Sequence, residues 1–264
     1  GIYIKEGEKL TLQDLLYGLM LRSGNDAALA IANNVSKNTE SFVKKMNEKA
    51  QELDMKNSLF RNPHGLDQED GGNISTAYDM AKLTSYAMKN KNFKKIVSTE
   101  KYTLKTNKNT YVWHNKNKLL YRYKYTTGGK TGFTKIARRT LVTTASKNNL
   151  NLVVVTLNDG NDFTDHENLF EYAFNNYTNY KILSKGFIKI KKENYYKKHK
   201  LYIKNDYSYP LSIDEKDSIR IKYQLKKIRK LKNNSKVGTA KIYFGDKLVH
   251  EENIYLKYSS KKSK

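Results

Sequence analysis

The sequence predicts an α+β fold: an antiparallel sheet flanked by helices, followed by a small all-β C-terminal domain. Apolar residues recur with helical spacing early in the chain, with strand-like spacing in the middle, and in short basic strands after about Lys185. A chain of 264 residues is long enough for one sizeable core and a smaller second domain. We therefore predict one domain over residues 1–182 and a β-rich domain over 183–264 that ends in a basic tail.

Helical spacing dominates the first part of the chain. Thr11 and Asp14 form a capping-box-like start, and the apolar run that follows stops at Ser23-Gly24-Asn25. Further helices are predicted from this break to about Val35, over 40–53, and from Thr76 to about Lys89.

The spacing changes to that of strands at Tyr102. Strands are predicted over 101–106, 110–114, 126–134, 139–146 and 150–157, and a helix over 166–176. Residues 151–157 are apolar enough to predict a central position in the sheet. In the second domain, strands are predicted over 186–192, 200–204, 218–223, 237–244 and 248–256.

Composition narrows the classes of protein and partner. The chain has 50 Lys and Arg against 26 Asp and Glu, a formal net charge of +24. Such a surplus attracts polyanions, so an anionic wall polymer or a membrane surface is a possible partner, and a solvated surface is the simpler alternative. No nucleic-acid-binding module is recognised, so we expect no nucleic acid partner. The absence of cysteine excludes thiol catalysis and disulfides.

Two short motifs stand out: Ser23-Gly24-Asn25 at the helix break and Lys130-Thr131-Gly132 on a strand. Their order and spacing, together with the segment 60–66 between them, form a characteristic pattern. Over about residues 1–180 the chain resembles the D-alanyl-D-alanine carboxypeptidases, the low-molecular-mass penicillin-binding proteins of the peptidase S11 family. Residues 186–256 resemble the family's β-rich C-terminal domain. The resemblance implies a β-lactamase/transpeptidase-like fold, with a domain that binds peptidoglycan stem peptides and acts outside the cytoplasmic membrane.

The resemblance also implies roles for individual residues in a serine acyl-enzyme reaction. Ser23 passes protons toward the leaving amine, and Asn25 binds the amide backbone of the substrate. Lys130 and the hydroxyl of Thr131 hold the terminal carboxylate of the substrate. The remaining implied residues are Gly132, for close approach of the substrate, Phe133, for an oxyanion-hole N–H, and Lys116, near which the family often has an arginine that helps hold the carboxylate.

The family's nucleophile belongs to a Ser-x-x-Lys motif that precedes the position of Ser23 by several tens of residues. Only 22 residues precede Ser23 here, and none of them is serine. Matches at Ser41, Ser98 and Ser259 fall on a polar helix side, a helix-to-strand junction and the tail, so none is a credible nucleophile. We therefore expect an N-terminally incomplete domain that is inactive alone, with exposed apolar strand faces, and that binds β-lactams only if the missing segment is present.

Two other functions remain open at this level. A β-lactamase-like hydrolase shares these motifs, although it usually has Asp where Gly24 stands. A catalytically dead peptidoglycan-binding module would use the same strand and basic surface without acyl transfer. The five histidines are scattered and no cofactor motif is present, so neither a metal nor a cofactor is predicted.

Overall fold

The structure is a computed structural model that describes residues 1–258 apart from 70, 192 and 231. The predicted basic tail and the Ser259 motif lie outside the described residues. The chain divides into two compact units, Gly1–Ala173 and Phe174–Lys264. The domain boundary after residue 182 stays a prediction.

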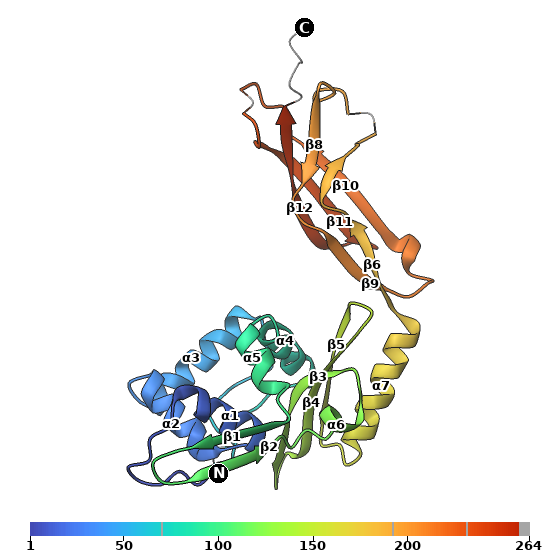
Figure 1. Ribbon diagram of the computed structural model, residues 1–264. Helices are drawn as coiled ribbons and strands as arrows, with labels where there is room; N and C mark the ends of the chain where they lie inside the picture. Colours follow the sequence, from blue (N-terminus) through green and yellow to red (C-terminus); the bar gives the residue numbers. More distant parts are fainter. Residues whose placement is uncertain (70, 192, 231, 259–264) are drawn as a thin grey trace. The chain divides into compact units, whose positions relative to one another are not determined.

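Helices form much of the first unit (Figure 1). They are α1 (Leu12–Arg22), α2 (Asn25–Val35), α3 (Thr39–Glu52), α4 (Ala77–Ala87), α5 (Lys91–Val97), α6 (Leu119–Arg122) and α7, which begins in this unit (Asp162–Asn176). The capping box predicted for α1 is present: the N–H of Asp14 donates to Thr11 Oγ1 at 3.1 Å, and the N–H of Thr11 donates to the Asp14 carboxylate at 2.9 Å. The break after α1 is confirmed, whereas α5 and α6 were not predicted.

The strands of the first unit are a hairpin of β1 (Lys101–Lys105) and β2 (Thr110–His114), and an antiparallel sheet in the order β3 (Thr126–Thr134), β4 (Arg138–Lys147), β5 (Leu150–Leu157). In Figure 1 the sheet lies between α4 and α7. His166 of α7 is fully buried and bonds to Thr143 of β4 at 2.5 Å and to Thr156 of β5 at 3.0 Å. On the other face, Met88 just after α4 contacts Thr144. The expected antiparallel sheet with helices on both sides is therefore confirmed.

One prediction about this sheet is wrong. Strand β5 was predicted to be central, yet it lies at the edge of the sheet that the described residues form. Its valines are half-buried because α4 packs against β5 on one face and α7 covers the other. An apolar run therefore indicates that both faces of a strand are covered. It does not indicate whether the strand has neighbouring strands on one side or on both.

Apart from the end of α7 and a short 3-10 turn, η1 (Lys216–Ser218), the second unit consists of strands and their connections. Its strands are β6 (Thr178–Leu183), β7 (Gly186–Ile188), β8 (His199–Ile203), β9 (Tyr207–Leu211), β10 (Ile219–Leu225), β11 (Lys236–Phe244) and β12 (Lys247–Tyr258). They pair as a sheet in the order β10-β11-β12-β8-β7 and as a separate β6-β9 ribbon. The core is formed by Leu183, Tyr196, Leu201, Ile203, Val237, Ala240, Ile242, Ile254 and Leu256. Among the described residues, no helix is both long and apolar enough to cross a bilayer.

Candidate active site

The break between α1 and α2 fixes the hydroxyl of Ser23. Helix α1 ends because Ser23 adopts the left-handed conformation, with a φ of 59°, and its N–H donates to the carbonyl of Leu19 at 3.0 Å. The N–H of Gly24 donates to Gly18 at 3.2 Å, and a Cβ on Gly24 would lie 3.1 Å from Ile2. The left-handed region costs a residue with a Cβ about 1–2 kcal/mol. Such strain is typical of functional positions.

Strand β3 carries the second motif, and its glycines allow unusually close strand contact. A Cβ on Gly132 would lie 2.4 Å from Oγ1 of Thr140 on β4. Gly129 has a φ of +152°, and a Cβ there would lie 2.2 Å from the carbonyl oxygen of Val142. Glycine is therefore required at 129 both by the backbone conformation and by the neighbouring strand. The pairing of β3 with β4, at the close approach that these glycines allow, fixes the segment Lys130–Gly132 relative to β4.

The two motifs meet in space although they are 107 residues apart. The ammonium group of Lys130 donates to Oγ of Ser23 at 2.5 Å and to the carbonyl oxygen of Thr131. Burial lowers the pKa of Lys130 to about 8, and the positive charge of Lys116 adds to this effect. Near neutral pH, Lys130 is thus a cation that gives up its proton unusually easily.

A loop between β2 and α6 places Lys116 beside this pair. The N–H of Lys116 donates to the carbonyl of Leu21 in α1 at 3.2 Å. Buried Asn115 and Asn117 flank it: the side-chain amide of Asn115 donates to the chain at Thr99, and the N–H of Asn117 donates to Oδ1 of Asn115 at 2.9 Å. Burial lowers the pKa of Lys116, with a smaller effect from Arg22. The loop is held in place by these hydrogen bonds, and it therefore positions Lys116 as a second cation next to Lys130.

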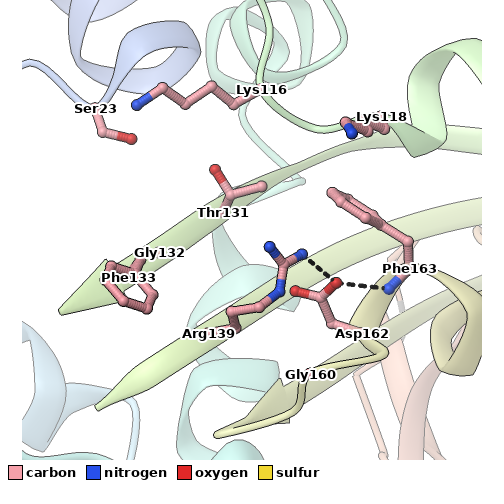
Figure 2. Close-up of a pocket in the computed structure, with 10 residues that line it drawn as sticks. All are labelled: Ser23, Lys116, Lys118, Thr131, Gly132, Phe133, Arg139, Gly160, Asp162 and Phe163. Carbon is pink, nitrogen blue, oxygen red and sulfur yellow. Dashed lines mark hydrogen bonds and ion pairs between the residues drawn. The ribbon is translucent and has the colours of Figure 1, made fainter. Parts of the chain in front are cut away.

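These elements enclose a cavity of about 620 Å³. It is lined by Ser23, Lys116, Lys118, Thr131, Gly132, Phe133, Arg139, Gly160, Asp162 and Phe163. Figure 2 shows the ammonium group of Lys116 pointing toward Ser23, with the hydroxyl of Thr131 below them. Lysine and arginine outnumber carboxylates in the lining, so the cavity suits an anionic ligand.

The structure brings most of the predicted site residues together. Ser23, Lys116, Thr131, Gly132 and Phe133 line the cavity, and Lys130 reaches it through Ser23. Phe133 is 66% exposed. Asn25 is the first residue of α2, two positions after Ser23, and is not among the residues that line the cavity.

Sequence reasoning missed a pair on the opposite wall. Arg139 of β4 donates to the carboxylate of Asp162 at 2.6 Å, and its guanidinium lies 5.5 Å from the centre of the Phe163 ring. Asp162 also accepts the N–H of Phe163 at 2.8 Å (Figure 2). Arg139 pairs directly with Phe133 across the β3–β4 hairpin, so the hairpin register would have found it. Asp162 was missed because the helix was predicted to start at residue 166.

The Ser-x-x-Lys serines within the described residues do not reach this cavity. Ser41 lies in α3, where its N–H donates to Oδ1 of Asn38 at 2.8 Å as part of a helix cap. Ser98 follows α5, and its hydroxyl donates to the carbonyl of Lys95 at 3.1 Å. Neither serine lines the cavity.

A strained serine between two helices, facing a Lys-Thr-Gly strand across a cationic cavity, is the arrangement expected of a penicillin-binding peptidase. The chain belongs to the D-alanyl-D-alanine carboxypeptidase family, whose model matches residues 1–161. Residues 177–262 match the C-terminal domain of penicillin-binding protein 5. The family predicted from the two motifs is therefore confirmed.

Individual relatives agree. The chain is 39% identical over 155 residues to the D-alanyl-D-alanine carboxypeptidase DacF of Bacillus subtilis. This match covers 58% of this chain and 39% of DacF. The chain is also 39% identical over 153 residues to a Streptomyces D-alanyl-D-alanine carboxypeptidase, covering 53% of this chain and 52% of the relative. Penicillin binding protein 5 of Haemophilus influenzae has a similar structure, with a TM-score of 0.74 and 25% identity over 97% of this chain and 76% of that one. The chain thus spans about half or less of the length of these curated relatives.

Proposed function

We propose that this chain provides the substrate-binding part of a serine-type D-Ala-D-Ala carboxypeptidase that removes the terminal D-Ala from peptidoglycan stem peptides outside the cytoplasmic membrane. The observation that carries the proposal is the contact between Lys130 and Ser23 beside the Thr131 hydroxyl in a cationic cavity. Family membership supports the same reaction.

The terminal carboxylate of the peptide binds to the cationic wall. Lys130 and Lys116 supply positive charge, and the hydroxyl of Thr131 supplies a directed donor. A hydrogen bond to a charged group is stronger than one between neutral groups, so a free carboxylate is selected over an amide. This preference is what distinguishes a carboxypeptidase site from a site for internal peptide bonds.

The scissile amide lies along β3 in this proposal. Gly132 has no side chain to hold the peptide away, and the N–H of Phe133 stabilises the oxyanion that develops on the carbonyl oxygen. Asn25 donates its side-chain amide to the peptide backbone. Ser23 accepts a hydrogen bond from Lys130 and is placed to pass a proton to the leaving amine.

Carboxylate selection is tested by calorimetry with a peptide that ends in D-Ala-D-Ala and the same peptide with a C-terminal amide. The carboxylate form should bind more tightly, and Thr131→Val should weaken its binding by about tenfold or more because a charge-assisted hydrogen bond is lost. Thr103→Val, on an exposed position of β1, is the matched control. Equal binding of the acid and the amide would contradict the proposal.

Residues 1–264 on their own are proposed to be inactive, because Ser23 in the cavity serves proton transfer in this proposal and neither Ser41 nor Ser98 lines the cavity. Incubation with a labelled penicillin followed by intact-protein mass spectrometry should show no covalent adduct. A stable adduct would show that a serine of this chain acts as the nucleophile.

A further inference from the structure

The second unit carries most of the net positive charge of the protein. Residues 174–264 contain 24 Lys and Arg against 8 Asp and Glu, which is +16 of the total +24. A field of this size in a small domain favours anionic partners and costs stability through self-repulsion. Where these charges lie on the domain determines which anionic partner they can bind.

The five-stranded sheet has one buried and one exposed face. Leu201, Ile203, Ile254 and Leu256 point into the core, each at most 6% exposed. The alternate residues of β7, β8 and β12 point outward, since side chains alternate along a strand. The outward residues are Phe187, Lys200, Tyr202, Tyr255 and Lys257, and we call this set the lysine–aromatic face.

An aromatic row crosses three strands of this face. Register places Phe187 opposite Tyr202, and Tyr202 opposite Tyr255. The ring centroids are 6.4 Å apart for the first pair and 5.6 Å for the second. The hydroxyl of Tyr202 donates to Asn234 at 2.8 Å, and Phe187 is 59% exposed. The rings form a continuous, partly exposed strip rather than single scattered residues.

Lysines gather on this strip without carboxylate partners. Lys200 and Lys257 lie directly opposite each other on β8 and β12, and both ammonium groups lie over the Phe187 ring, at 5.1 and 5.9 Å from its centre. Lys204 lies 3.9 Å above the Tyr255 ring. Within the described part of the chain, none of these three lysines forms an ion pair with Asp or Glu. Like charges directly opposite in a sheet are destabilising, so an anionic ligand would relieve a cost that the free protein carries.

We propose that the lysine–aromatic face binds an anionic polysaccharide. The C–H faces of sugar rings pack on aromatic rings, and the rings of Phe187, Tyr202 and Tyr255 repeat at a spacing comparable with one sugar unit. Lys200 and Lys257 take the carboxylate or phosphate groups of the polymer. A bilayer fits less well because lysine ammonium groups lie over the rings of Phe187 and Tyr255, and the hydroxyl of Tyr202 is bonded to Asn234, so the rings are not free to insert as anchors.

This binding is separate from the peptide site in the first unit, so it is tested without any peptide. Binding of the full chain to short hyaluronan oligosaccharides, which alternate N-acetylglucosamine and glucuronate, is measured by calorimetry. Lys200→Gln/Lys257→Gln should weaken binding by about 25-fold, because each lysine near an anionic surface contributes on the order of a fivefold factor. Phe187→Leu, which leaves the net charge unchanged, should also weaken binding.

The matched control is Lys44→Gln/Lys91→Gln, which removes two exposed lysines of the first unit and should change binding by less than about twofold. Circular dichroism and melting temperatures establish that each variant is folded. An equal loss in the control, or an unchanged affinity in Phe187→Leu, would reduce the effect to net charge and overturn the proposal. So would tighter binding to phosphatidylglycerol vesicles or to single-stranded DNA than to the polysaccharide.

Discussion

The chemistry of Lys130 depends strongly on its surroundings. Burial and the neighbouring charge of Lys116 lower its pKa to about 8, far below the ordinary value of 10.5. Both effects disfavour the ammonium form in the free protein. A bound carboxylate favours that form again, so ligand binding and protonation of Lys130 are linked.

This linkage predicts a pH dependence of peptide affinity. Because the pKa of Lys130 in the free protein is lowered to about 8, the cation predominates below about pH 8 and is progressively lost above it. Affinity for a D-Ala-D-Ala peptide should therefore fall as the pH rises through about 8. Calorimetric titrations with the peptide from about pH 6 to about pH 10 measure this change in affinity.

Arginine variants provide the control for this titration. Lys130→Arg and Lys116→Arg keep the positive charge across the whole range, because arginine is not deprotonated in proteins. Lys130→Arg should flatten the profile, and Lys116→Arg should leave the fall near pH 8. If Lys130→Arg showed the wild-type profile, another group would be responsible.

At the scale of elements, an ion pair between Arg139 and Asp162 ties the first turn of α7 to β4. Asp162 is 3% exposed in its side chain, whereas the Arg139 side chain is 45% exposed. The buried carboxylate depends on Arg139 and on the N–H of Phe163 for its hydrogen bonds. Removing either partner leaves a polar group buried with fewer bonds than it needs.

A double-mutant cycle of Asp162→Asn and Arg139→Gln should reveal this dependence. Each single variant should lower the free energy of unfolding by about 1–3 kcal/mol. The double variant should lose less than the sum, with a coupling of about 1 kcal/mol, a modest value because Arg139 remains exposed to solvent. Urea denaturation measures all three, and strictly additive losses would mean that the pair contributes nothing to docking of α7.

The sequence predicted elements well where local chemistry decides them. The Thr11–Asp14 capping box and the break at Ser23 were predicted because both follow from backbone hydrogen bonding over a few residues. The predicted start of helix α7 was four residues too late, because its first turn is stabilised by Arg139 of β4, which is distant in the sequence. Strands β6 and β9 were missed because each pairs with the other and not with the larger sheet. Even at the near end of this pair, 23 residues of chain separate Leu183 from Tyr207.

In the candidate site too, residues in local motifs were predicted and residues brought in by tertiary packing were not. Ser23 and Lys130 were found through their motifs, and the structure adds that they touch. Arg139, Asp162 and Phe163 belong to no motif and enter the cavity only because β4 and α7 end beside it. Contacts between distant segments depend on tertiary packing, which short sequence patterns do not encode.

At the scale of the whole molecule, the second unit has a core of its own. Every buried residue of that core, from Leu183 to Leu256, belongs to residues 174–264. We therefore expect residues 174–264, produced separately, to fold as a stable β domain. Circular dichroism and dispersed amide signals in an NMR spectrum would establish this.

Ile254 gives the control for that experiment, because it is 0% exposed at the centre of the core. Ile254→Asp buries an unpaired carboxylate and should unfold the isolated domain. A random-coil spectrum for the unaltered fragment would mean that the second unit depends on the first.

The left-handed backbone at Ser23 has a consequence for engineering. Glycine adopts this conformation without penalty, so Ser23→Gly relieves about 1 kcal/mol of strain. The same change removes the oxygen that accepts the buried Lys130 ammonium group, and losing a hydrogen bond to a buried charge costs about 1–3 kcal/mol. The melting temperature should therefore not rise, although glycine is the residue that the backbone alone would favour. A substitution chosen only to relax the backbone at this position would give up the contact between the two motifs without a gain in thermostability.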